Sequence, residues 1–529
     1  MKTITKYLLS FALLLAAGLL PVACNEDLET NPTDKVSGPV IFANETAAQT
    51  AINGVYALLW RSPFAGNSTQ AYGHQSNLLA QDLMAEDMVQ LTFNWFGWDY
   101  DLSYTATINI GTTSRSYNVW NMWYTIISNV NYIIAEDGHI GSNGNVAKNI
   151  VAQAYAIRAF AYFELIQGFQ KTYLGHQNDA GVPVYTEPTR SGDEGKPRGT
   201  VEAVYTQINA DIQHALDLFT AIGKPVQSHS SHVDYYVTKG FEARIALVQG
   251  RDQDACNAAE EALLRLGNNK VIPAGDITNG LSDKSLASTL WAMEMIPDQS
   301  QVYGSLYCHF DARNPQSYGS GHRKCISSWL YSKINKAGLA DVRLKWFYDD
   351  NQGSATSGDA VNYGQKKRMA RELANWVGDL IFMRGEEMLL IAAEAKARLN
   401  LAGDAKNLLL ELAKNRQTTP AALANYTTYL NGLNTAVASL PADTNTDPAT
   451  VLEEVLLQRR IELWGETGRV KDLLRLKQGY NRDYAGSNHT EKLVNYNSGP
   501  ESGAFLFKIP QTEFDGNKNI LPSEQNPVR

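Results

Sequence analysis

Helical segments recur along this chain in adjacent pairs, and this pattern constrains the fold more than any other feature of the sequence. The paired segments are 149–167 with 200–219, 237–249 with 252–265, and 384–399 with 403–414. Small residues recur where two helices must approach closely, namely Ala243, Ala246, Ala392, Ala393 and Ala397. Helical hairpins of this kind bury their apolar stripe against the next pair. The sequence therefore predicts a mainly α fold of tetratricopeptide-like hairpins, interrupted because the spacing between pairs is irregular.

Two further helices and two insertions complete the predicted body of the chain, residues 40–529. An apolar stripe begins near residue 45, and a second one covers about 117–136, where Trp120 and Tyr124 are predicted to be core residues. The helical repeats are expected at about 117–266 and 384–479. Loop-rich insertions are expected at about 61–116 and 267–379. Insertions between rigid repeats are where binding surfaces usually lie.

The first 24 residues have the order of an export signal that ends in a cysteine. Basic Lys2 and Lys6 precede an apolar run at 8–20, which is too short to span a bilayer, and small residues lead to Cys24. We predict a signal peptide at 1–23, lipidation of Cys24 and an acidic tether at 24–39. Pro21 stands where a bacterial lipobox usually has Leu. Ordinary secretion with an incidental cysteine is therefore the alternative.

Composition excludes some classes of partner. The formal charge of −9 argues against nucleic acid, whose phosphates need a basic face, and against an anionic membrane surface as the main partner. Contact with the membrane is expected only through the lipid anchor. The chain has 26 Tyr and 10 Trp. Tyr and Trp beyond the needs of a core often line polar binding surfaces, because each ring has a flat apolar face and a hydrogen-bonding edge.

Signatures of catalysis and of metal binding are weak. The sequence has no Walker loop, no strand-bound G-x-G-x-x-G, no H-E-x-x-H and no G-x-S-x-G. Asp443, Asn445, Asp447 and Glu454 have the spacing of a calcium loop, but Pro448 occupies the position that needs Gly. We expect instead that Asp447 caps a helix opened by Pro448. No cofactor, no metal site and no catalytic residue is predicted.

The cysteines allow one disulfide. Cys256 lies in a helical pattern and is expected to be a small buried apolar residue. Cys308 and Cys325 could pair across a loop in an oxidising exported setting, or remain free, because the sequence does not give their Cα separation.

One aromatic cluster stands out as a candidate binding site. Residues 93–101 alternate large rings and carboxylates with small or polar residues, and the candidate ligand contacts here are Trp95, Trp98, Asp99 and Tyr100. Such a set suits a sugar, whose C–H faces stack on rings while its hydroxyls bond to carboxylates. The alternative is that these rings attach a loop to the helical core. A more dispersed series in the long insertion adds the candidates Tyr303, Tyr318 and Trp329.

A charged segment near the C-terminus carries the most specific pattern in the chain. The residues that keep it are Arg459, Arg460, Glu462, Leu463, Glu466, Arg469, Asp472, Leu473 and Arg475. Their spacing allows ion pairs along and between helices, which is a structural role. With Arg158, Arg384, Glu387 and the 507–510 ending, this pattern resembles the SusD/RagB family of outer-membrane lipoproteins. Gln458 and Thr467 depart from the family's pattern, but the resemblance extends over nearly the whole chain.

The resemblance implies a function. It implies a SusD-like fold without enzymatic activity, whose loops hold a glycan and whose helical repeats pack on a SusC-like TonB-dependent transporter. Glu26 and Asp27 also resemble the acidic signal that directs such lipoproteins to the cell surface of the outer membrane. Two alternatives remain open at this point. One is a helical scaffold that binds only protein, and the other is a lipid-anchored glycoside hydrolase.

Overall fold

The computed structural model describes residues 42–61, 69–93, 95–102, 110–190, 192–351, 361–490 and 498–527. The predicted signal peptide, Cys24 and the tether lie outside these residues. No helix in the described ranges is long and apolar enough to cross a membrane.

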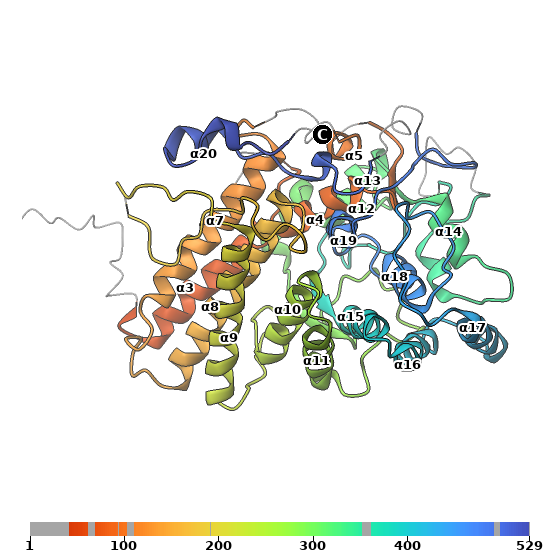
Figure 1. The fold of residues 1–529 in the computed structure, drawn as a ribbon, viewed down its shortest axis with the longest axis horizontal. Coiled ribbons are helices and arrows are strands. Elements are labelled where there is room, and N and C mark those ends of the chain that lie inside the picture. The colour runs from red at the N-terminus through yellow and green to blue at the C-terminus, as the bar shows by residue number, and fades with distance from the viewer. Residues whose placement is uncertain are drawn as a thin grey trace, which may run out of the picture.

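Four long helices form one half of the molecule. They are α3 (Glu45–Leu58), α7 (Arg115–Ile134), α8 (Asn145–Phe169) and α9 (Val201–Ala221). Figure 1 shows them side by side, with α8 packed between its sequence neighbours α7 and α9. Hydroxyl groups cap two of these helices: Ser114 accepts from the backbone N–H of Tyr117, and Thr200 accepts from that of Ala203. The predicted helices at 45, 117–136, 149–167 and 200–219 are confirmed.

The second helical array continues through the long insertion. It consists of α10 (Tyr235–Val248), α11 (Asp252–Leu263), α15 (Gly385–Arg398), α16 (Ala402–Ala413) and α17 (Pro420–Gly432). Helix α11 packs on both α10 and α15, although more than a hundred residues separate it from α15 in the sequence. Ala243, Ala246, Ala392 and Ala393 are fully buried. The interrupted array of helical hairpins is therefore confirmed.

The charged C-terminal pattern falls on two helices, α18 (Val451–Glu462) and α19 (Arg469–Leu476). Between them the backbone turns through Gly465 and Gly468, whose φ angles of +71° and +73° favour glycine. The start of α18 differs from our prediction. Thr450, with Glu453, caps this helix, whereas the exposed Asp447 pairs with Lys333 at 2.6 Å. The prediction that Asp447 caps a helix opened by Pro448 is therefore wrong, because the helix begins at Val451.

Two short antiparallel ladders organise the loop-rich regions. Strand β1 (Met88–Gln90) pairs with β3 (Lys324–Ile326), with Met88 opposite Ile326, and β2 (Thr289–Met293) pairs with β4 (Leu380–Arg384). The β1–β3 ladder joins the first insertion to the second. The segment that follows β1 is thereby placed beside the segment that precedes β3, and this juxtaposition builds the candidate site.

Short helices fill the remaining space. The α-helices are α4 (His74–Leu83), α5 (Gly97–Tyr100), α12 (Leu306–Phe310), α13 (Tyr318–Gly321), α14 (Ser328–Ile334) and α20 (Gln511–Gly516). The 3₁₀ turns are η1 (Leu264–Leu266), η2 (Pro297–Gln299), η3 (Val302–Gly304), η4 (Val342–Trp346), η5 (Gly503–Phe505) and η6 (Pro522–Glu524). Helix α4 lies within a predicted loop-rich stretch, yet all ten of its residues are buried.

The three cysteines within the described residues are buried and free. Cys256 is a buried helical residue, as predicted. Cys308 in α12 and Cys325 in β3 form no disulfide, so the possible pairing across this loop is not present in the structure.

Candidate ligand-binding site

Four aromatic rings from separate segments meet near α13: one is exposed, two are half-buried and one, Trp376, is buried. Trp95 packs on Tyr318 with ring centroids 4.3 Å apart, Tyr318 contacts Tyr303 at 5.7 Å, and Tyr303 contacts Trp376 at 5.5 Å. We call these four residues the aromatic ledge. Tyr303 is the most open of them, with 43% of its surface exposed. The structure thus brings together three of the sequence-predicted residues, Trp95, Tyr303 and Tyr318, and adds Trp376.

The backbone of the ledge is unusual at three positions. Trp95, Val302 and Trp376 have φ angles of +49°, +50° and +51°, in the left-handed region that bulky and β-branched residues seldom adopt. Each such residue costs on the order of 1–3 kcal/mol and persists only where its surroundings hold it. Strained positions of this kind cluster at ligand sites, so the three outliers mark the ledge as a candidate functional surface.

Local contacts hold the ledge segments in place. Tyr318 begins α13, where Ser317 caps the turn and donates to the carbonyl of Asp311 at 2.6 Å. Gly319 is required here, because a Cβ atom would lie 2.7 Å from the backbone of Phe310. On the other side, the Ser300 hydroxyl donates to the carbonyl of Asn375 at 2.8 Å and ties the Tyr303 segment to the Trp376 segment.

A buried aromatic layer supports the ledge from below. His309 contacts Tyr318 at 4.9 Å, Tyr72 at 5.3 Å and Phe96 at 5.1 Å. Burial and the nearby Lys324 lower the pKa of His309 well below its usual value, so the imidazole is neutral. This layer is therefore apolar and uncharged at physiological pH, which favours packing over chemistry.

Two of the predicted ligand contacts lie inside the fold. Asp99 is buried and pairs with Arg115 at 3.2 Å, and burial raises the pKa of this carboxyl while Arg115 opposes the shift. Tyr100 is buried, and its hydroxyl lies 2.6 Å from Nδ1 of His489. Neither side chain is available to a ligand in this conformation, because each fastens α5 to neighbouring segments.

The remaining two candidates differ from each other. Trp98 is 38% exposed and packs edge-on against the exposed Phe93, with centroids 5.2 Å apart. Trp329 in α14 is half-buried, with the cations of Lys333 and Arg460 at 4.7 and 4.8 Å from its ring. Trp98 therefore extends the exposed aromatic surface of the 93–101 segment, whereas Trp329 packs within a separate charged environment. The buried Phe96 and Tyr100 anchor this segment to the core, whereas Trp95 is half-buried and Trp98 is exposed, so the sugar-binding interpretation stays a prediction.

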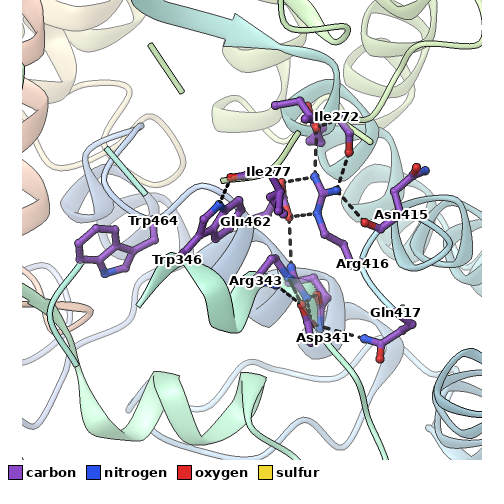
Figure 2. Close-up of polar contacts among 12 residues, drawn as sticks. Ile272, Ile277, Asp341, Arg343, Trp346, Asn415, Arg416, Gln417, Glu462 and Trp464 are labelled. Atoms are coloured by element: carbon purple, nitrogen blue, oxygen red, sulfur yellow. Dashed lines mark hydrogen bonds and ion pairs between the residues drawn. The ribbon is translucent and has the colours of Figure 1, made fainter. Parts of the chain in front are cut away.

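The charged pattern of α18 forms a buried ion-pair network (Figure 2). Glu462 accepts from Arg416 at 2.7 and 2.9 Å, from Arg384 at 2.9 Å and from Arg343 at 3.2 Å. Arg416 also reaches Glu386 at 3.1 Å. Burial alone would raise the pKa of Glu462, but Arg416 and Arg384 lower it well below its usual value. The network joins α15, α18, the end of β4 and the turn that follows α16 to η4, which confirms that these charges lie where they can pair between elements.

The rings of the ledge make stacking the chemistry that this surface offers. Within the described ranges, no group of three or more His, Cys, Asp or Glu side chains is placed to hold a metal ion. Sequence reasoning missed Trp376. In the sequence, Trp376 is a lone tryptophan between Asn375 and Val377. The structure shows that this stretch forms a tight turn, closed by an antiparallel bridge between Glu372 and Val377, which the sequence did not indicate.

Comparison with known proteins identifies relatives along the whole chain. Residues 59–246 match a family described as "Starch-binding associating with outer membrane", and residues 343–528 match the SusD family. The chain is 25% identical to SusD-like protein P2 of Formosa agariphila, over 98% of this chain and 99% of the relative.

Two solved structures show the same fold. A SusD-like carbohydrate binding protein from Bacteroides vulgatus is 23% identical with a TM-score of 0.74, and the match covers 92% of this chain and 99% of that one. A laminarin binding SusD-like protein is 18% identical with a TM-score of 0.62, and it is covered over 100% of its length and 92% of this chain.

Proposed function

Because this chain belongs to the SusD family of glycan-binding proteins, we propose that it captures a polysaccharide at the cell surface through the aromatic ledge. The ledge carries the proposal, since the exposed ring of Tyr303 and the half-buried rings of Trp95 and Tyr318 offer a sugar chain stacking faces along one surface. The exposed Phe93–Trp98 pair lies on the segment that supplies Trp95 and could extend the contact to further sugar units.

The relatives narrow the ligand class. One matching family is described as starch-binding, and one structural neighbour binds laminarin. Both ligands are neutral glucans. The contacts of the ledge are between aromatic rings. Such a surface suits neutral sugars, which bind by stacking and by hydroxyl hydrogen bonds instead of by charge.

The protein works without catalysis in this proposal. It is held at the outer membrane by a lipid on Cys24 and passes its glycan to a SusC-like TonB-dependent transporter, on which the helical repeats pack. The family matches support association with the outer membrane, and the transporter is the partner that the family resemblance implies.

Substitution of ledge residues tests the proposal. Binding to starch and laminarin hexasaccharides is measured by calorimetry for Tyr303→Ala, Tyr318→Ala and the double variant. We expect each single change to weaken binding about tenfold, the factor that 1.4 kcal/mol represents, because a stacking face is removed. The matched control is Tyr236→Ala on α10, a half-buried tyrosine that packs edge-on against Tyr235. Unchanged binding by the double variant would contradict the proposal, and release of shorter sugars by the wild-type protein would support the hydrolase instead.

A further inference from the structure

A second aromatic pocket lies away from the ledge, between α7, the 183–189 segment and α20. Its volume is about 350 Å³, and four rings line it: Tyr117, Trp120, Tyr124 and Tyr185. Small-molecule sites typically measure roughly 300–1,000 Å³, so the pocket is large enough for a short ligand. Figure 1 shows α20 beside the upper end of α7. We call this pocket the α7 groove.

The rings of the α7 groove form a connected set. Trp120 and Tyr124 have centroids 4.9 Å apart, and Tyr124 meets Tyr185 edge-on at 5.9 Å. The Tyr124 hydroxyl donates to the carbonyl of Pro183 at 2.8 Å, which fixes this ring relative to the 183–189 segment. Since helix spacing places Trp120 and Tyr124 one turn apart, their rings continue along one wall of the groove.

Polar groups are arranged around these rings. The Glu513 carboxylate accepts from Nε1 of Trp120 at 3.1 Å and from Nδ2 of Asn517 at 2.7 Å, which holds it in one orientation. An ionised carboxylate has about four acceptor sites, so two bonds leave it able to accept from a ligand hydroxyl. Hydroxyls of Ser128 and Thr189, 3.2 Å apart, lie on the opposite part of the lining.

We propose that the α7 groove is a second carbohydrate site, which takes one end or one branch of a neutral oligosaccharide. The half-buried rings of Tyr117, Tyr124 and Tyr185 would stack on sugar faces with the buried Trp120 behind them, while Glu513 and the two hydroxyls would bond to sugar hydroxyls. Among the described lining residues Glu513 is the one carboxylate, and the cation of Lys196 lies 5.5 Å from the ring centroid of Tyr185, so these opposite charges give the groove no excess charge that would select an anionic sugar. A purely apolar ligand would cover the carboxylate and the hydroxyls without replacing their hydrogen bonds to water, which is costly.

This site is separate from the ledge. The ledge draws on residues 95, 303, 318 and 376, and the groove shares none of them. The inference rests on the proposed function only for the class of ligand. A polysaccharide presents many equivalent units, so a second contact on the same chain raises its apparent affinity through effective concentration.

The test follows Trp120 while the ledge is disabled. The whole chain is labelled with 5-fluorotryptophan in a Tyr303→Ala/Tyr318→Ala background, and the ¹⁹F resonance of Trp120 is assigned by Trp120→Phe. Starch and laminarin hexasaccharides are then titrated. We expect at least one of them to shift the Trp120 resonance in a saturable manner, although the ledge no longer binds.

A filled groove provides the decisive variant. Thr512 is an exposed lining residue of α20, so Thr512→Phe places a ring into the groove without removing a core contact, and we expect it to weaken the titration at least about tenfold. The control is Asn129→Phe, which adds the same ring at an exposed position of α7 outside the lining. Absence of any saturable shift, or an equal response in Thr512→Phe, would overturn the proposal. A shift caused by the purified transporter but by neither sugar would overturn it too, and would assign the groove to protein docking. The groove is tested in a variant that lacks both ledge tyrosines, whereas the ledge is tested in a protein whose groove is unchanged. Each proposal can therefore fail without the other.

Discussion

Two residues of the ledge, Trp95 and Trp376, combine an aromatic side chain with an unfavourable backbone. Trp95 is the clearest case, because its ring stacks on Tyr318 while its φ of +49° suits glycine better than tryptophan. In the proposed function this ring serves glycan binding and not local stability. Stability and function should therefore separate at this position.

Two substitutions of Trp95 isolate the backbone contribution. Both Trp95→Gly and Trp95→Ala remove the ring, so both should weaken glycan binding to a similar extent. Only glycine relieves the left-handed backbone, so we expect Trp95→Gly to be more stable than Trp95→Ala by about 1 kcal/mol in urea unfolding. Greater stability of the alanine variant would show that the backbone at this position is not strained.

At the scale of elements, buried ion pairs set how the helices meet. Glu462 of α18 is the clearest example, since arginines from three other segments converge on it, and Figure 2 shows two of them, Arg343 and Arg416. Removing one partner of such a network leaves the others buried and uncompensated.

Glu462→Gln should lower the free energy of unfolding by about 3–5 kcal/mol, the usual cost of breaking a buried pair. Urea denaturation measures the change. The matched control is Glu411→Gln, whose partner Lys270 lies 3.4 Å away in a partly exposed pair, and it should cost at most about 1 kcal/mol. Similar losses of unfolding free energy in both variants would mean that the buried network stabilises the fold no more than a partly exposed ion pair.

A second ion pair makes stability depend on pH. Glu394 of α15 accepts from Arg475 of α19 at 2.6 and 2.9 Å. Burial would raise the pKa of Glu394, but Arg475 and Arg398 lower it to about 2, below the value of about 4.3 for an unfolded glutamate. The stabilisation is therefore complete above about pH 4.3 and is lost as the pH falls toward 2.

The corresponding experiment compares wild type with Glu394→Gln across pH. The free energy of unfolding of the wild-type protein, relative to that of Glu394→Gln, should fall by roughly 3 kcal/mol between pH 5 and pH 2. The reason is that the pKa of Glu394 is about 2 in the folded chain and about 4.3 in the unfolded chain. Urea midpoints measured at each pH give this difference. A constant difference would show that Glu394 does not titrate with folding.

For the whole molecule, periodic patterns predicted most of the helices and the interrupted array. Helix α4 escaped prediction because polar residues such as His74, Asn77 and Asp82 are buried on all its faces, so the segment lacks an apolar stripe. The predicted start of α18 was wrong because Asp447 followed by Pro448 is a typical sequence for a helix start, whereas Thr450 is the residue that caps the helix.

The binding surface was predictable only in part, for a related reason. Trp95, Tyr303 and Tyr318 were chosen from composition, but the sequence does not reveal that β1 pairs with β3 and brings their segments together. Asp99 and Tyr100 lie in the same aromatic and acidic segment as Trp95, so the composition of the segment does not distinguish them. Only the tertiary contacts to Arg115 and His489 show that they point inward.

The proposed lipid anchor at Cys24 is tested on the whole chain. Cys24→Ser should remove incorporation of radiolabelled palmitate and release the protein from the outer-membrane fraction, because more than one acyl chain is needed for stable anchoring. Cys256→Ser is the control, since this cysteine is buried in α11. Palmitate incorporation that persists in Cys24→Ser would place the anchor elsewhere or exclude it.

The separate origin of the four ledge rings has a consequence for how binding preference can change. Each ring lies on its own stretch of chain. Trp95 precedes α5, Tyr303 lies in η3, Tyr318 begins α13, and Trp376 follows residue 372. A substitution in one stretch replaces one ring, while the helical array below is untouched. If the ledge binds glycan as proposed, its preference can thus be changed one ring at a time by loop exchange, without redesigning the helical array.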